Sequence, residues 1–185
     1  VYQKNSESVE VATAYLRILY NLAKKQDDEQ VLKAIADKAS TVYEKHSGSE
    51  RVSVRYLRIL DYLVSKQDDE QGLKDTTDKA STVYQKNSES VEVATVYLRI
   101  LYDLASKQDD EQVLKDTANK AATVYEKNSD LEYFVYLYVM ILVNHIRVNI
   151  SISDLNEDLN KLDSLLDNRF IVRLDLVIDI MSSLL

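Results

Sequence analysis

The sequence contains no proline, no cysteine and only two glycines among its 185 residues. β-Sheets and long loops need glycine and proline at their turns, so this scarcity favours helices joined by tight polar turns. A chain without cysteine has no disulfide, no thiol nucleophile and no thiolate zinc site. With two glycines it also has no glycine-rich phosphate-binding loop. We therefore expect neither a metal nor a cofactor.

The chain also lacks any basic run, and its net charge is −8. Phosphate backbones and anionic membranes repel such a chain on average, so we expect neither nucleic acid nor a membrane as a partner. The most apolar stretch, residues 133–143, is much shorter than the roughly 20 residues of a membrane-spanning helix. This stretch predicts a buried core helix instead. The expected location is the cytoplasm.

A unit of 41 residues repeats along the sequence, marked by the pair Val-Tyr at residues 1, 42, 83 and 124. Residues 1–41 are identical to residues 83–123 at 34 of 41 positions. We expect three repeats, at 1–41, 42–82 and 83–123, with the start of a fourth at 124. Because the chain begins in the middle of a unit, we interpret it as part of a longer protein.

The regular array is predicted to end at residue 129. Residues 130–185 are more apolar and lose the 41-residue register, so we expect a degenerate fourth repeat followed by capping helices. The apolar ending of this segment suits continuation of the chain or self-association, because the caps of solenoids normally present a polar outer face.

Each repeat contains two amphipathic patterns with the three- and four-residue spacing of one helix face. In the third repeat these patterns predict an A helix over about 90–107 and a B helix over about 110–127. Neither helix buries its apolar face alone, so successive helices must stack. The sequence therefore predicts an all-α fold, an α-solenoid of antiparallel helix pairs.

The six residues KQDDEQ join the two helices of each repeat, at 25–30, 66–71 and 107–112. We predict Asp109 as the N-cap of the third B helix, with Gln112 at N3 in a variant of the capping box. The same register is expected in the other two copies. A calcium or magnesium site is the alternative, but calcium loops spread their ligands over alternate positions and need a turn glycine. We interpret the acidic triplets as helix caps.

Two tyrosines recur on the apolar pattern of every repeat, one late in the B helix and one in the A helix. Core or inter-repeat packing is the interpretation we favour over binding for both sets. They are Tyr2, Tyr43, Tyr84 and Tyr125 on the B helices, and Tyr15, Tyr56 and Tyr97 on the A helices.

The pattern Y-L-x-I-L-x-x-L-A-x-K-Q, followed by an acidic turn and an alanine-bearing second helix, resembles the tetratricopeptide repeat family. Leu101 stands where that family has its helix A leucine, and Ala121 matches its small residue late in helix B. The family's unit is shorter, about 34 residues. Its glycine is replaced by Tyr102, and its closing proline is absent. The resemblance implies right-handed superhelical stacking with the A helices lining a concave surface.

The polar stripe of the A helices is therefore the candidate binding surface. One arginine recurs in three repeats with tyrosines beside it, and both residue types are enriched at protein interfaces. We hypothesise that this ladder grips acidic or carboxylate-bearing peptide segments. The alternative is that each arginine pairs with a nearby acid, as Arg99 can with Asp103. The candidate residues are Arg17, Arg58, Arg99, Tyr20, Tyr62, Tyr102, Thr95 and Asp103.

The sequence shows no pattern that points to catalysis. His46 and His145 lie in different repeats, and the abundant acids are expected on exposed turns, where their pKa values stay ordinary. We expect a non-catalytic scaffold that binds a protein or peptide. Two alternatives remain: a structural array that self-associates through its repeat ends or apolar C-terminus, and a regulatory module of a larger signalling protein.

Overall fold

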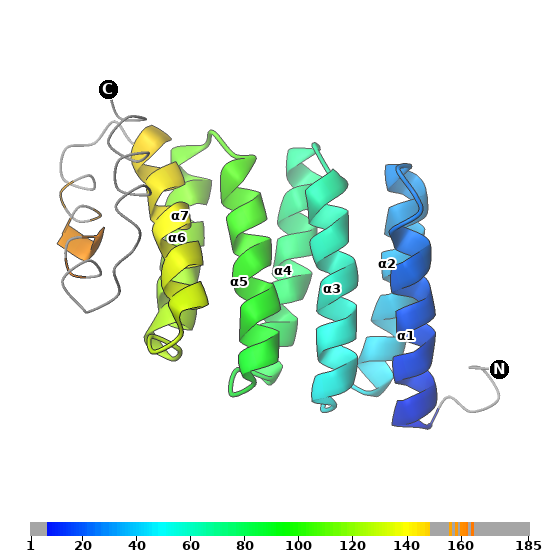
Figure 1. The fold of residues 1–185 in the computed structure, drawn as a ribbon. Helices are drawn as coiled ribbons and strands as arrows, with labels where there is room; N and C mark the ends of the chain where they lie inside the picture. Colours follow the sequence, from blue (N-terminus) through cyan, green and yellow to red (C-terminus); the bar gives the residue numbers. More distant parts are fainter. Residues whose placement is uncertain (1–6, 149–155, 157, 159, 163, 165–185) are drawn as a thin grey trace. The chain divides into compact units, whose positions relative to one another are not determined.

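The computed structural model describes residues 7–148 together with positions 156, 158, 160–162 and 164. In this part of the chain all regular secondary structure is α-helix (Figure 1). The predicted all-α, solenoid-like fold is confirmed. None of the described helices is long and apolar enough to cross a membrane.

The helix boundaries repeat with the 41-residue period of the sequence. A helices begin at residues 9, 50, 91 and 132, and B helices begin at residues 29, 70 and 111. The bounds predicted for the two helices of the third repeat are correct to within one residue at each end. The helices are α1 (Val9–Ala23), α2 (Glu29–Lys45), α3 (Glu50–Lys66), α4 (Glu70–Lys86), α5 (Val91–Ser106), α6 (Glu111–Glu126) and α7 (Glu132–Val148).

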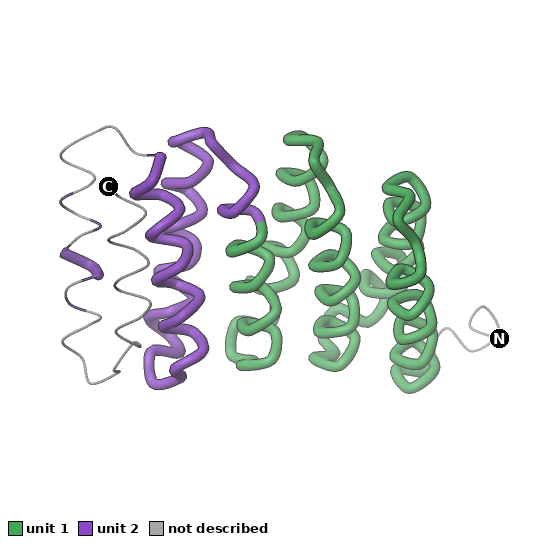
Figure 2. Tube along the Cα trace, turned by 45° about the horizontal axis from the view of Figure 1, so that its top comes forward, with its two compact units in different colours: residues 1–103 green, residues 104–185 purple. Residues whose placement is uncertain are grey.

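The chain forms two compact units, residues 1–103 and 104–185, and the boundary between them lies inside α5 (Figure 2). In the first unit, α1, α3 and most of α5 form one layer, and α2 and α4 form a second layer (Figure 1). Helix α3 packs against α1, α2 and α4. In the second unit, α6 packs against α7. The division by sequence into 1–129 and 130–185 stays a prediction.

The B helices begin at an aspartate cap, but the predicted register was wrong by one residue. Asp110, not Asp109, is the N-cap of α6, and its Oδ1 accepts a hydrogen bond from the Val113 N–H at 2.9 Å. Gln112 therefore lies at N2 and forms no capping box; its amide donates to Asp116 instead. The same shift occurs at the other two B helices, whose caps are Asp28 and Asp69.

A glutamine lies in the link before each shifted cap, at residues 26, 67 and 108. After α3 the chain becomes extended at Gln67, which is fully buried. Gln108 of the third repeat is buried as well. Gln26 of the first repeat is only half-buried although α2 has the same cap register, so the shift does not require a buried glutamine.

The two recurring tyrosines stack on each other, with the B-helix ring lying against the ring of the next A helix. Ring centroids lie 5.0, 4.8 and 5.0 Å apart in the pairs Tyr43–Tyr56, Tyr84–Tyr97 and Tyr125–Tyr138. Burial raises the pKa of Tyr97 to about 12. The predicted core packing is confirmed for these pairs. Tyr15 is half-buried, and Tyr2 lies outside the described residues.

Helix α7 in the second unit is buried along one side, while Tyr133 and Tyr136 remain exposed. The buried side includes His145, whose Nδ1 lies 2.6 Å from Oδ2 of the buried Asp158. Most of the helices predicted beyond residue 155 lie outside the described residues.

Candidate binding surface on the A helices

All eight predicted site residues belong to the first unit and lie on α1, α3 or α5. The recurring arginine occupies the same repeat position on three helices of one layer (Figure 1). Arg17 is exposed, whereas Arg58 and Arg99 are half-buried. The tyrosines beside them are also half-buried. The three arginines therefore have different environments, although their local sequences are nearly identical.

Arg99 is engaged by a carboxylate of the preceding repeat. Its Nε donates to Oδ1 of Asp61 at 2.8 Å, and its Nη2 donates to Oδ2 of the same side chain. The side chain of Asp61 is 12% exposed, and that of Arg99 is 42% exposed. This two-pronged contact is the geometry in which arginine binds carboxylates most strongly.

Sequence reasoning did not find Asp61, because it considered only acids on the arginine's own helix. The signal was present in the repeat alignment. Asp61 occupies the position that Tyr20 and Tyr102 hold in the other two repeats, so an acid is found there in the second repeat alone.

Arg58 lacks the carboxylate partner that Arg99 has. The preceding repeat has Tyr20 at the position that Asp61 holds for Arg99. Among the described residues, the side chains of Arg17 and Arg58 form no hydrogen bond or ion pair. Arg58 is thus a half-buried cation whose equivalent in the next repeat binds a carboxylate.

Helix α3 adds two further arginines that the sequence analysis left out. Arg51 and Arg55 precede Arg58 by seven and three residues, so all three lie on one side of the helix. Arg51 is exposed and Arg55 is half-buried. The single acid in the last three turns of α3, Asp61, is already paired with Arg99. The chain is acidic overall, but this side of α3 is basic.

The flanking candidates differ in what they can offer a partner. Lys24 lies over the Tyr20 ring at 5.7 Å, and Lys66 lies over the Tyr62 ring at 5.9 Å. The hydroxyl of Thr95 donates to the Val91 carbonyl at 2.7 Å, so it serves its own helix. Tyr102 and Asp103 are half-buried at the end of the first unit.

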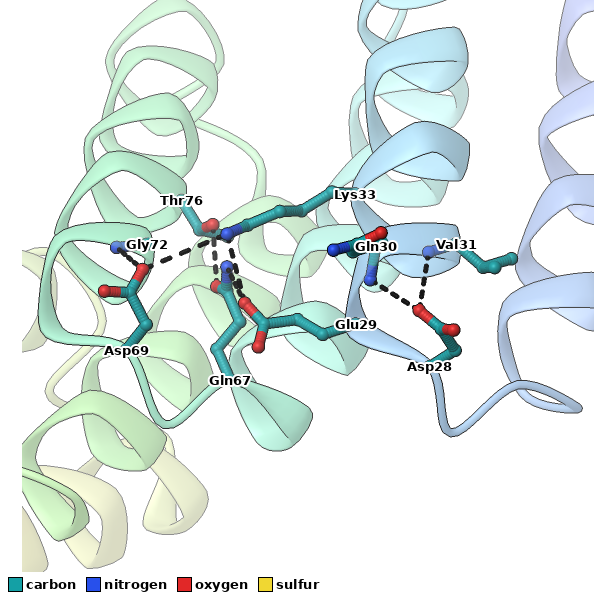
Figure 3. A network of polar contacts seen from close by, with 9 residues as sticks. All are labelled: Asp28, Glu29, Gln30, Val31, Lys33, Gln67, Asp69, Gly72 and Thr76. Carbon is teal, nitrogen blue, oxygen red and sulfur yellow. Dashed lines mark hydrogen bonds and ion pairs between the residues drawn. The ribbon is translucent and has the colours of Figure 1, made fainter.

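The acidic triplets form a separate network that joins α2 to α4 (Figure 3). Glu29 pairs with Lys33 at 3.1 Å and accepts from Nε2 of Gln67 at 3.4 Å. Oε1 of Gln67 in turn accepts a 2.9 Å hydrogen bond from the hydroxyl of Thr76. Asp27 pairs with Lys66 of the next repeat at 2.9 Å. These carboxylates are used in caps and in contacts between repeats.

Two observations bear on the metal alternative. Within the described residues, no group of three or more His, Cys, Asp or Glu side chains is arranged to hold a metal ion. The glycine of the second copy also has a packing role, because a Cβ at Gly72 would lie 2.6 Å from Oδ2 of Asp69 and 2.7 Å from Nε2 of Gln67. The carboxylates of this network cap helices and join neighbouring repeats.

Replacing Gln67 by leucine is expected to lower the free energy of unfolding by about 1–3 kcal/mol. The buried Thr76 hydroxyl would lose its acceptor, and an unsatisfied buried polar group costs that much. Urea denaturation followed by circular dichroism measures the change. The matched control is Gln26→Leu, at the same position of the first repeat, where the side chain is half-buried and the expected change is within about 0.5 kcal/mol. Equal losses in the two variants would contradict the role given to this network.

No protein family model matches the chain, and no curated protein is similar to it in sequence.

Proposed function

We propose that this protein is a non-catalytic scaffold that binds a carboxylate-bearing peptide or protein segment on the A helices of the first unit, centred on Arg58. The observation that carries this proposal is the Arg99–Asp61 contact. The chain itself uses this ladder position to bind a carboxylate, and Arg58 has the same position without an internal acid.

The local charge supports an acidic partner. Arg51, Arg55 and Arg58 lie on one side of α3, in a chain whose net charge is −8. Long-range attraction of an acidic segment is weak for such a chain, so its recognition would depend on contacts at short range. Tyr20 and Tyr62 provide stiff amphipathic surface beside the guanidinium groups.

The repeat architecture is compatible with a longer variant of the tetratricopeptide repeat. We infer that the A helices line a concave face of a right-handed superhelix, as the resemblance implies. The 41-residue period of the helix starts and the pairing of A and B helices support this inference. The buried contact of His145 with Asp158 belongs to the second unit, and we assign it no catalytic role.

Replacing Arg58 by glutamate is expected to weaken binding of an acidic peptide by at least about ten-fold. One charge-assisted contact is worth about 1.5–3 kcal/mol, and each 1.4 kcal/mol is a factor of ten in affinity. The probe is a short fluorescein-labelled peptide of alternating glutamate and tyrosine, titrated with the protein and followed by fluorescence anisotropy. A reference peptide has glutamine in place of glutamate and is expected to bind weakly.

The matched control is Lys74→Glu, which makes the same change of charge on the exposed side of α4. It is expected to change the affinity less than about two-fold, since it lies in the other helix layer and surface charges are screened by salt. Equal weakening by both substitutions would mean that only net charge matters. Unchanged binding by a folded Arg58→Glu variant would exclude this surface.

A further inference from the structure

The first repeat has an apolar face that later repeats bury. Ile18, Leu22 and Val31 are 56%, 46% and 40% exposed. The residues at the first two of these positions in the second repeat, Ile59 and Leu63, are 1% and 4% exposed. Helix α3 packs against α1 and α2, so these positions of the second repeat are covered by the first. The equivalent face of α1 and α2 has no such neighbour among the described residues.

The polar contacts between repeats have a direction. Donors of a later repeat reach acids of the preceding one, as in Lys66 to Asp27, Gln67 to Glu29, Lys79 to Asp37 and Arg99 to Asp61. The 3.9 Å ion pair of Lys33 with Asp69 runs the other way. Each repeat therefore has a leading edge rich in donors and a trailing edge rich in carboxylates.

The first repeat carries the same donors at its leading edge. The residues equivalent to Lys66, Gln67, Lys79 and Arg99 are Lys25, Gln26, Lys38 and Arg17. Their side chains meet none of the corresponding acids within the described residues. Gln26 shows the difference most clearly, because it is half-buried whereas Gln67 is fully buried. The first repeat thus has both the apolar side chains and the donors of a repeat interface. Among the described residues, no other repeat packs against them.

We infer that this leading face, defined by Ile18, Leu22, Lys25 and Gln26, docks the trailing edge of another regular repeat of the 41-residue type. The interface between the first two repeats shows what such an occupant supplies, namely an apolar helix pair and acids at positions 27 and 29 of its unit. Continued in register, the fourth unit has Ile150 and Ile152 at these positions. The fourth unit of this sequence therefore lacks the matching carboxylates. This inference does not depend on the function proposed for the A-helix surface.

The test lengthens the full chain by one repeat. A copy of residues 83–123 joined directly before Val1 continues the repeat in register and places Asp109 and Glu111 opposite the leading face. We expect the lengthened chain to have a higher urea midpoint and slower amide hydrogen exchange in α1. The Ile18→Glu substitution is expected to lower the midpoint of the lengthened chain by about 1 M, but that of the parent chain by less than about 0.3 M.

The control is Ala34→Glu, at an exposed position where the second and third repeats have Asp75 and Asp116. Both chains are expected to tolerate it equally. The inference is overturned if Ile18→Glu has the same effect in both chains, or if the added repeat leaves the exchange of α1 unchanged. It is also overturned if the parent chain dimerises in sedimentation experiments and Ile18→Glu abolishes the dimer, because the occupant would then be a second copy.

Discussion

A Tyr97→Ala variant is expected to lose about 3–5 kcal/mol of free energy of unfolding, the usual cost of removing a large buried aromatic ring. Tyr97 is 2% exposed, and its ring stacks on Tyr84 with centroids 4.8 Å apart. Alanine would leave a cavity between the end of α4 and the middle of α5. Urea or thermal denaturation followed by circular dichroism measures the loss.

Two further substitutions serve as controls. One tests the contribution of the Tyr97 hydroxyl, and the other tests the contribution of the position in the array. Tyr97→Phe keeps the stacked ring and loses only the contact of the hydroxyl with Ser81, so it should cost about 1 kcal/mol. Tyr15→Ala removes the equivalent, half-buried tyrosine of the first repeat and should cost clearly less than Tyr97→Ala. If Tyr97→Phe were as damaging as Tyr97→Ala, the stack would not be the source of stability.

An Arg99→Met variant is expected to lose about 2–4 kcal/mol. It leaves the carboxylate of Asp61, whose side chain is 12% exposed, without its cation, and an uncompensated buried charge is strongly destabilising. The range extends down to about 2 kcal/mol because the Arg99 side chain is 42% exposed, and solvent screens its ion pair with Asp61. Denaturant unfolding of the purified variant measures this loss of free energy of unfolding.

The double variant Asp61→Leu with Arg99→Met identifies the cause of that loss. Removing both partners leaves no buried charge, and replacing a buried pair by apolar residues is often nearly neutral. We therefore expect the double variant to be more stable than Arg99→Met alone. A double variant that is no better than the single one would show that packing of the arginine stem, rather than the stranded charge, sets the cost.

Local patterns in the sequence were sufficient for the helices. Apolar spacing and the serine or aspartate before each helix act within a few residues, so they placed α5 and α6 to within one residue at each end. The cap of the B helices was misplaced by one residue in all three copies, because each link offers two adjacent aspartates and local capping preference does not choose between them.

The contacts that distinguish the three arginines could not be obtained in the same way. Arg99 and Asp61 are 38 residues apart, and only the packing of α3 beside α5 brings them together. Equal spacing in the sequence predicted an equivalent ladder, whereas the side chains show one arginine already occupied and Arg58 without an internal acid. The candidate site is therefore narrower than predicted, and it extends along α3 to Arg51 and Arg55.

The segment KQDDEQ has a second role besides helix capping. Its second aspartate caps the B helix in all three copies. In the second copy its lysine and glutamine, Lys66 and Gln67, also reach acids of the preceding repeat.

Amide and arginine side-chain chemical shifts, measured by NMR while the glutamate–tyrosine peptide is titrated into the labelled protein, test the proposed binding surface most directly. We predict that the largest changes fall on α3 at Arg51, Arg55 and Arg58 and on the neighbouring Tyr20 of α1. Changes confined to α2 and α4, or no saturable change at all, would contradict the account.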